Sequence, residues 1–484
     1  MVWCHRRDVV GNSTCSETVT LFSQRLDRLW GGRKRRWISL LATLLETFFF
    51  STFFSGFNAL IQPYIEIGTF GELCDETDCT RAEQMFGYAY ITGLCFQMCS
   101  APLSGILMDQ IGLRITKLFG VAIYFIGCLM FAFVSAGTSY LIFPAMIFGA
   151  VGAYASVLCN LHIASVFPVW RGMIISGLNG AYESSSVFAF VIAKTSPAFA
   201  LRDSFILLGC FAFVAGCLVS TFILTQRTTD MQKLAKSTTS DTSTPEFADE
   251  QEDSVYNREV EHLIQCYYPD KKSCFLSEAY TMAYFYFLPG VLRFSLYFSQ
   301  LDQQLLYSFT HEHEVVNKLL LASSYTSMSA ILLSPFTGLV IDYSRKVAKQ
   351  KLESKLAVGD LKPRRIYWYH MCSLAPTLFL LATLSFYISC TLYITGQQWV
   401  YYTQFVAIVF MGSILPSVTN TFIMTAFPLK YFGTLMGVLS LIGGIFSLVQ
   451  FGLIQLPIAI GNGFMVVSSV IMFIPPIFLF IGAN

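Results

Sequence analysis

Long apolar runs separated by short polar stretches make up most of this chain. A run of about 20 apolar residues is long enough to cross the hydrocarbon of a bilayer as an α-helix. The pattern therefore predicts an all-α membrane protein of about twelve transmembrane helices. Their expected positions are 37–62, 86–108, 117–136, 139–163, 172–194, 203–224, 276–300, 317–341, 368–395, 398–425, 432–455 and 463–483.

A polar segment interrupts this series after the sixth run. Its section 237–253 is rich in Ser, Thr, Asp and Glu and poor in apolar residues, which is typical of a flexible linker. The expected organisation has four parts, which are a basic N-terminal tail (1–36), a six-helix bundle (37–224), a cytoplasmic linker (225–275) and a second six-helix bundle (276–484).

Two signals recur at matching places in the two halves. A glycine precedes an aspartate by four residues at the end of the second predicted helix, as Gly105 and Asp109, and at the end of the eighth, as Gly338 and Asp342. A Phe-Pro pair stands before the fifth helix and again before the eleventh. Signals that repeat in register indicate an internal duplication, so the two bundles are predicted to be pseudo-symmetric.

The position of the charges predicts how the chain crosses the membrane. Charged residues make up 13% of the chain and the net charge is +1, which favours no nucleic-acid partner. Most Lys and Arg lie in the tail, the linker and alternate loops, which is typical of cytoplasmic segments, whereas the first loop on the other side is acidic. We therefore expect a multi-pass protein, in the plasma membrane, with both termini in the cytoplasm.

The 14 cysteines do not have the spacing of a metal site, because no Cys-x-x-Cys occurs. We expect no metal and no cofactor; the expected partners are the lipid bilayer and a small-molecule solute, and nothing indicates an oligomeric state. Cys74 and Cys79 lie in the acidic loop predicted to be extracellular, where a disulfide between them would persist.

The stretch Gly105-x-x-x-Asp109-x-x-Gly112-x-Arg114, between the second and third helices, resembles the signature of the major facilitator superfamily. Gly105 would let a neighbouring helix approach closely, and Asp109 could accept hydrogen bonds from the N-terminal end of the eleventh helix. Arg114 could pair with a nearby acidic group; the alternative is ordinary loop capping. The residues expected to act in gating are Gly105, Asp109, Gly112, Arg114, Asp342 and Arg345.

A closer resemblance is to solute carrier family 43. It is carried by Glu46 on the first helix, Asn160-Leu-His162-Ile on the fourth, Asn179-Gly-Ala-Tyr-Glu183-Ser-Ser-Ser186 on the fifth and Tyr431-Phe-Gly433-Thr-Leu-Met-Gly437 on the eleventh. The resemblance implies a sodium-independent facilitative carrier, whose solute is either a large neutral amino acid or a nucleobase.

Polar side chains inside membrane helices are costly and call for a cavity, a partner or a function. Asn179, Glu183 and Ser186 are spaced so that they share one helical face, which favours a wet cavity, with interhelical hydrogen bonding as the alternative. The residues that we expect to bind the solute or to couple its movement are Glu46, Asn160, Asn179, Glu183, Ser186, Arg293, Gln404 and Asn420.

Glu46 and Arg293 carry opposite charges inside predicted spans. Glu46 could titrate with a proton, pair with a cation or be a protonated structural residue. Arg293, taken as the one cation well inside a span, is expected to pair with Glu46 or Glu183, the alternative being a solute carboxylate.

The sequence favours a carrier over other membrane proteins. An intramembrane enzyme would need a nucleophile with a base, or paired metal ligands, inside the spans, and we expect no such set there. The open alternatives are a transporter-like receptor or scaffold and a proton-coupled carrier.

Overall fold

The computed structural model of the chain describes most of the predicted helical region. The described residues are 32–50, 56–74, 79–167, 170–196, 198–224, 260, 262–309, 313–356 and 363–483. Most of the predicted N-terminal tail and of the linker, residues 1–31, 225–259 and 261, therefore lies outside the described part.

The first half of the chain forms one group of packed helices. Its elements are α2 (Gly32–Phe50), α3 (Asn58–Glu66), α4 (Thr80–Gln110), α5 (Leu113–Ala132), α6 (Ile142–Asn160), α7 (Arg171–Ser184), α8 (Val187–Thr195) and α9 (Leu201–Leu218). Short helical turns η2 (Gly71–Leu73), η3 (Ala136–Leu141), η4 (Leu161–Val166) and η5 (Val219–Ile223) adjoin them.

The second half forms a similar group. Its elements are α12 (Lys271–Phe275), α13 (Glu278–Ser308), α14 (His313–Met328), α15 (Ala330–Leu356), α16 (Pro363–Cys372), α17 (Ala375–Thr391), α18 (Gln398–Ala426), η6 (Leu429–Tyr431), α19 (Phe432–Ser447), α20 (Val449–Gln455), α21 (Ile458–Ile471) and α22 (Ile474–Ala483).

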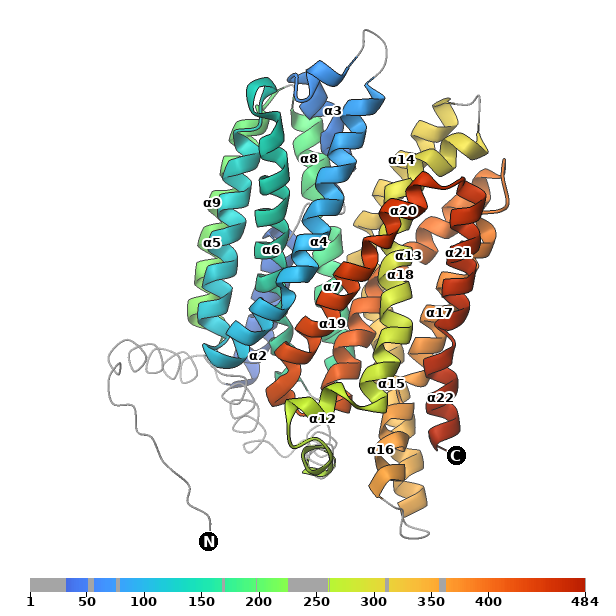
Figure 1. Cartoon of the computed structure of the whole chain (residues 1–484). Helices are drawn as coiled ribbons and strands as arrows, with labels where there is room; N and C mark the ends of the chain where they lie inside the picture. The colour runs from blue at the N-terminus through green and yellow to red at the C-terminus, as the bar shows by residue number, and fades with distance from the viewer. Residues whose placement is uncertain are drawn as a thin grey trace.

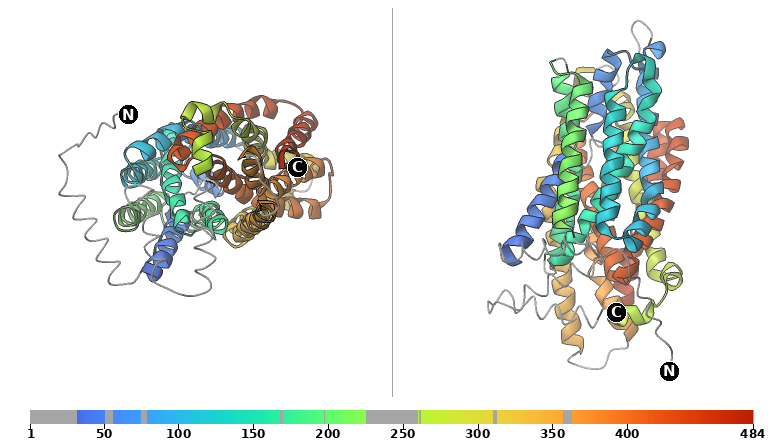
Figure 2. Two further views of the ribbon diagram at one scale, coloured as in Figure 1. Left: turned by 90° about the horizontal axis from the view of Figure 1, so that it is seen from below. Right: turned by 90° about the vertical axis from the view of Figure 1, so that its left-hand side faces the viewer.

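The two groups stand side by side as two bundles, and α15 and α16 of the second bundle extend below the first (Figure 1). Helix α4 packs on α19 and α7 packs on α15, so two helix pairs hold the bundles together. The view along the bundle axis shows the helices of both halves arranged as a ring (Figure 2). Helix α2 begins and α22 ends at the same end of the molecule, as an even number of crossings requires.

Length and apolar composition alone identify seven described helical segments able to cross a membrane, and nine if two bent pairs each count as one span. Three further predicted spans do not meet this test. The first predicted span is divided between α2 and α3, and the fifth predicted span between α7 and α8. The seventh predicted span corresponds to α13, which carries Arg293. Interrupted and polar helices of this kind are the ones that line sites in transporters.

The observed helices differ from the predicted ones at two places that matter below. Helix α5 begins at Leu113 rather than at residue 117, so Lys117 lies one turn inside the helix and not at its first position. Helix α15 continues to Leu356, well past residue 341, where the eighth span was predicted to end.

Candidate functional site

At one end of the molecule, a carboxylate of the first bundle holds the start of a helix of the second. Asp109, near the end of α4, accepts hydrogen bonds from the backbone N–H of Thr434 (3.1 Å) and from its hydroxyl (2.9 Å). Thr434 lies in the first turn of α19, where unpaired N–H groups and the helix dipole attract a negative charge. This is the contact predicted from the sequence.

The second bundle makes the equivalent contact with the first. Asp342 on α15 accepts hydrogen bonds from the backbone N–H groups of Gly172 and Met173, both at 2.8 Å, at the start of α7. The duplication therefore places one carboxylate in each half against a helix N-terminus in the other half. We call these two contacts the latches, and the end where they lie the latch end.

Glycines let the helix backbones approach at both latches. A side chain on Gly105 of α4 would collide with the backbone of Gly433 in α19, and one on Gly338 of α15 would collide with Met173 in α7. Gly112 has a different role, because its φ of +106° lies in a region that only glycine adopts readily, at the sharp turn between α4 and α5.

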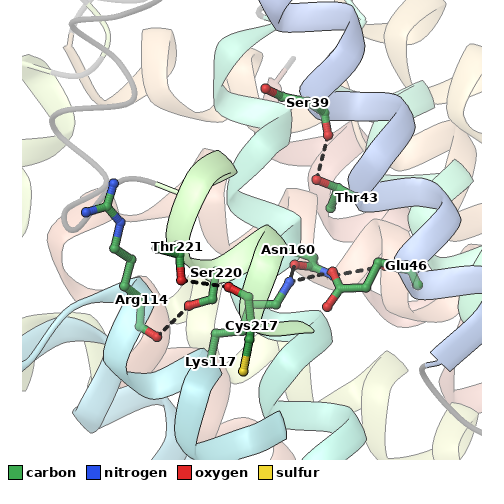
Figure 3. Close-up of polar contacts among 10 residues, drawn as sticks. Ser39, Thr43, Glu46, Arg114, Lys117, Asn160, Cys217, Ser220 and Thr221 are labelled. Carbon is green, nitrogen blue, oxygen red and sulfur yellow. Dashed lines mark hydrogen bonds and ion pairs between the residues drawn. The ribbon is translucent and has the colours of Figure 1, made fainter. Parts of the chain in front are cut away.

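The other residues predicted to act in gating lie close to the latches. Arg114 donates from Nε to the carbonyl of Leu224 (2.6 Å), and its own carbonyl accepts from Ser220, which connects the start of α5 to the end of the sixth span (Figure 3). Arg345 follows Asp342 by three residues on α15. Beyond the latch region, Cys74 and Cys79 form a disulfide.

The polar face predicted on the fifth span points at the second bundle. Ser176 Oγ lies 2.9 Å from Thr337 Oγ1 on α15, and Asn179 donates to Ser417 Oγ on α18 (3.1 Å). Glu183 ends against the backbone of α18, where a Cβ added to Gly412 would lie 2.5 Å from Glu183 Oε1. Three residues of one helix face thus meet the opposite bundle.

Both helices of this contact are interrupted close to Glu183. The fifth span breaks between α7 and α8, at residues 185 and 186, and the eighth breaks between α14 and α15, at Ser329. The backbone N–H of Ile331, just after its break, donates to Ser184 Oγ (2.7 Å). The two interruptions therefore lie at the same depth and are joined.

Glu46 belongs to a separate network inside the first bundle. Lys117 Nζ lies 2.5 Å from both Glu46 Oε2 and Asn160 Oδ1, and Asn160 Nδ2 donates to Glu46 (3.1 Å) and to Thr47 (3.0 Å). The four residues come from α2, α5 and α6 and are all buried. Figure 3 shows Glu46, Lys117 and Asn160 converging between these helices.

The expected partner of Arg293 was wrong. Glu46 pairs with Lys117, and no ion pair joins Arg293 to either Glu46 or Glu183 among the residues described. Arg293 is 2% exposed, and its guanidinium carbon lies 5.7 Å from the Tyr297 ring centre. Its Nε and Nη1 have no hydrogen-bond partner within the described part. Arg293 was also not the one cation inside a span, because Lys117 is fully buried.

Of the remaining residues predicted to bind the solute, one is hydrogen-bonded inside the second bundle and two have a polar atom without a partner in the described part. Gln404 is hydrogen-bonded within the second bundle, to Tyr297 and Thr391. Asn420 Oδ1 and Ser186 Oγ are buried and have no partner among the described residues. In the same part of the chain, no three His, Cys, Asp or Glu side chains gather in a way that would hold a metal.

Sequence reasoning missed Lys117, Phe294 and Gly412. Lys117 was placed at the first position of a predicted span, although nearby apolar residues could have indicated a buried position. Phe294 lies against Gly412, with Phe294 Cε2 2.7 Å from a Cβ built on that glycine. Both residues lie in apolar helices, where their types carry no signal of a site.

Comparisons with known proteins agree with this geometry. The family model of the major facilitator superfamily matches residues 40–451. The chain is 24% identical over 451 residues to equilibrative nucleobase transporter 1 of Bos taurus, covering 86% of this chain and 89% of that relative. It is 26% identical over 171 residues to large neutral amino acids transporter small subunit 3 of Mus musculus, covering 32% and 30% of the two chains.

A solved structure shares the fold. The proton:xylose symporter XylE bound to 6-bromo-6-deoxy-D-glucose is similar with a TM-score of 0.62 and 12% identity, over 94% of this chain and 97% of that one. The family match spans most of the chain, and the solved structure shares the fold along almost its whole length. The chain therefore belongs to the major facilitator superfamily, as a multi-pass membrane transporter of small solutes.

Proposed function

We propose that the chain is a facilitative carrier that moves a purine nucleobase or a large neutral amino acid by alternating access. The observation that carries this proposal is the pair of symmetry-related latches, which bridge the two bundles at one end. In this proposal the chain lies in the plasma membrane, and the latch end, with both termini, faces the cytoplasm.

The latches are contacts that can break as a unit. Each consists of one carboxylate against a helix N-terminus, so rotation of one bundle exposes both partners to water at once. Water can then satisfy the freed N–H groups and carboxylates, which keeps the two states close in free energy. Gating by Asp109 and Asp342 is consistent with this.

Ring contacts bridge the bundles toward the other end. Phe190 on α8 packs on Tyr325 of α14 with ring centres 5.6 Å apart, and Tyr88 on α4 packs on Phe451 of α20 at 6.5 Å. Phe190 follows Gly172 by as many residues as Phe451 follows Gly433, so these contacts obey the same duplication. A solute bound between the latches and the ring contacts would meet the polar face of the fifth span.

The buried charges support facilitated movement over proton coupling. Glu46 is engaged by Lys117 and Asn160 within one bundle. A rocking motion between bundles leaves this network intact, so transport need not expose or neutralise Glu46. We assign Glu46 and Asn160 to bracing the first bundle, and Asn179, Glu183 and Ser186 to the solute site.

The named relatives define the solutes to test first. They are an equilibrative nucleobase transporter and a large neutral amino acid transporter subunit. The purified full-length chain in proteoliposomes is expected to take up at least one of adenine, guanine, leucine and phenylalanine. Uptake should saturate, equilibrate without concentrating the solute, and proceed equally without sodium and without a proton gradient.

Two results would contradict the proposal. Binding of a solute without its equilibration across the membrane would indicate a receptor. Accumulation above equilibrium that follows an imposed proton gradient would indicate proton coupling.

A further inference from the structure

We propose that Glu183, Phe294 and Gly412 form the solute subsite, and that this subsite recognises a flat nitrogen heterocycle with two adjacent N–H donors on one edge. Guanine is the simplest base with that edge. The inference rests on the proposed carrier function and adds the solute class and the residues that select it.

The three residues converge from both bundles. Glu183 lies on α7 of the first bundle, and Phe294 and Gly412 lie on α13 and α18 of the second. A Cβ placed on Gly412 would stand 2.5 Å from Glu183 Oε1 and 2.7 Å from Phe294 Cε2. A carboxylate, an aromatic ring and a stretch of bare helix backbone therefore meet at one point of the bundle interface.

The Glu183 carboxylate has no partner of its own. Every other acidic group assigned above is engaged, with Glu46 held by Lys117, Asp109 by Thr434 and Asp342 by the start of α7. Within the described part of the chain, the Glu183 carboxylate makes no ion pair or hydrogen bond. The Glu183 side chain is partly exposed, so its carboxylate oxygens are free to accept hydrogen bonds from a ligand that supplies N–H donors.

The depth of Glu183 is that of a transport site. It lies 11 residues after Gly172 of a latch and seven before Phe190 of a ring contact, which corresponds to about 16 Å and about 10 Å of helix. The breaks in the fifth and eighth spans lie beside it. Discontinuous helices at mid-depth are where transporters of this general design hold their solutes.

The chemistry of the three groups matches one edge and one face of a base. An ionised carboxylate only accepts hydrogen bonds, and its two oxygens can receive two parallel N–H donors. An aromatic ring offers a surface on which a flat heterocycle stacks. The bare backbone at Gly412 lets the Glu183 carboxylate and the Phe294 ring lie close to each other, so that one solute can contact both.

The same geometry argues against a zwitterion. An amino acid would need a positive group for its carboxylate beside Glu183. Arg293 precedes Phe294 directly, and consecutive residues of a helix point about 100° apart, so the guanidinium does not share the face of Phe294. The subsite thus offers a negative group without a matching positive one, which suits a neutral donor.

Uptake in proteoliposomes tests the subsite, with guanine, hypoxanthine and phenylalanine as solutes. Hypoxanthine keeps the ring system of guanine but lacks the 2-amino group, and so offers a single N–H on that edge. Glu183→Gln should raise the half-saturation concentration for guanine by about tenfold or more, because it removes hydrogen bonds to a charged acceptor. The increase for hypoxanthine should be several-fold smaller.

A control variant on the protein surface and two variants of Phe294 complete the test. Glu278→Gln makes the same substitution at an exposed residue that pairs with Arg364, and should leave uptake unchanged. Phe294→Leu should weaken guanine uptake about fivefold or more by removing the stacking surface, whereas Phe294→Tyr should retain it. Each rate is normalised to the amount of monodisperse protein reconstituted.

The outcomes separate the subsite from the carrier function. If wild-type protein takes up guanine and Glu183→Gln affects guanine and hypoxanthine equally, or neither, the subsite is wrong and the carrier function stands. Uptake of phenylalanine without guanine also overturns the subsite alone. No uptake of any tested solute by wild-type protein contradicts the carrier function itself.

Discussion

The buried pair of Lys117 and Glu46 offers a quantitative test of how the first bundle is held together. Lys117 is fully buried, Glu46 is 6% exposed, and the amide of Asn160 bonds to both. Lys117→Met would leave the Glu46 carboxylate without its cation in the interior. Removing one partner of such a pair destabilises a protein by about 3–5 kcal/mol.

Replacing both charges should cost much less. In the double variant Glu46→Gln/Lys117→Met no uncompensated charge remains, and exchanging a buried pair for uncharged residues of similar volume is often close to neutral. The loss of stability in the double variant should therefore be smaller than the sum of the two single losses, by an interaction term of at least about 3 kcal/mol. The exposed pair Arg364 and Glu278 supplies the control, since Arg364→Met should cost under about 1 kcal/mol.

Unfolding of the purified variants in mixed detergent micelles, followed by far-UV circular dichroism, measures these differences. The cycle requires the wild type, both single variants and the double variant under one set of conditions. Additive single-variant losses, with no interaction term, would refute the role of this pair as a brace between α2 and α5.

Three further predictions concern the latches. Gly105→Ala forces a methyl group into the backbone of α19 and should destabilise the protein by about 1–3 kcal/mol. Gly71 has open space around it, so Gly71→Ala should not destabilise the protein. Thermal unfolding of the two variants in parallel measures the difference. Asp109→Asn and Asp342→Asn should each raise labelling of cysteines introduced at the latch end, and the double variant should raise it further; unchanged labelling would count against the latches. Lys271→Gln removes the bond from Lys271 Nζ to Thr434 (3.1 Å) and should also loosen the Asp109 latch, with a smaller effect than Asp109→Asn in the same labelling assay.

The sequence predicted the features that depend on local pattern. Runs of apolar residues located the spans, and the repeated Gly-x-x-x-Asp element led to the Asp109 contact because a carboxylate at a helix boundary has few alternatives to a helix N-terminus. The spacing of Asn179 and Glu183 placed them on one face because helical periodicity alone decides that.

The features that were missed depend on which helices lie next to each other. Glu46 pairs with Lys117 rather than Arg293 because α2 packs near the start of α5, and no pattern within either segment encodes that neighbour. Lys117 stands at a predicted helix boundary, where a cation is ordinarily assigned to the membrane surface. Gly412 can be recognised as part of the subsite only because Glu183 packs against it, and Glu183 is more than 200 residues away in the chain.

A reversible cross-link between the bundles tests alternating access most directly. Ser176 Oγ and Thr337 Oγ1, 2.9 Å apart near the latch end, are close enough for cysteines at both positions to form a disulfide. In proteoliposomes, oxidation of Ser176→Cys/Thr337→Cys should stop solute uptake and reduction should restore it, while each single-cysteine variant stays active under oxidation. Full uptake by protein shown by mass spectrometry to be cross-linked would contradict the account, because the bundles would then not need to separate there.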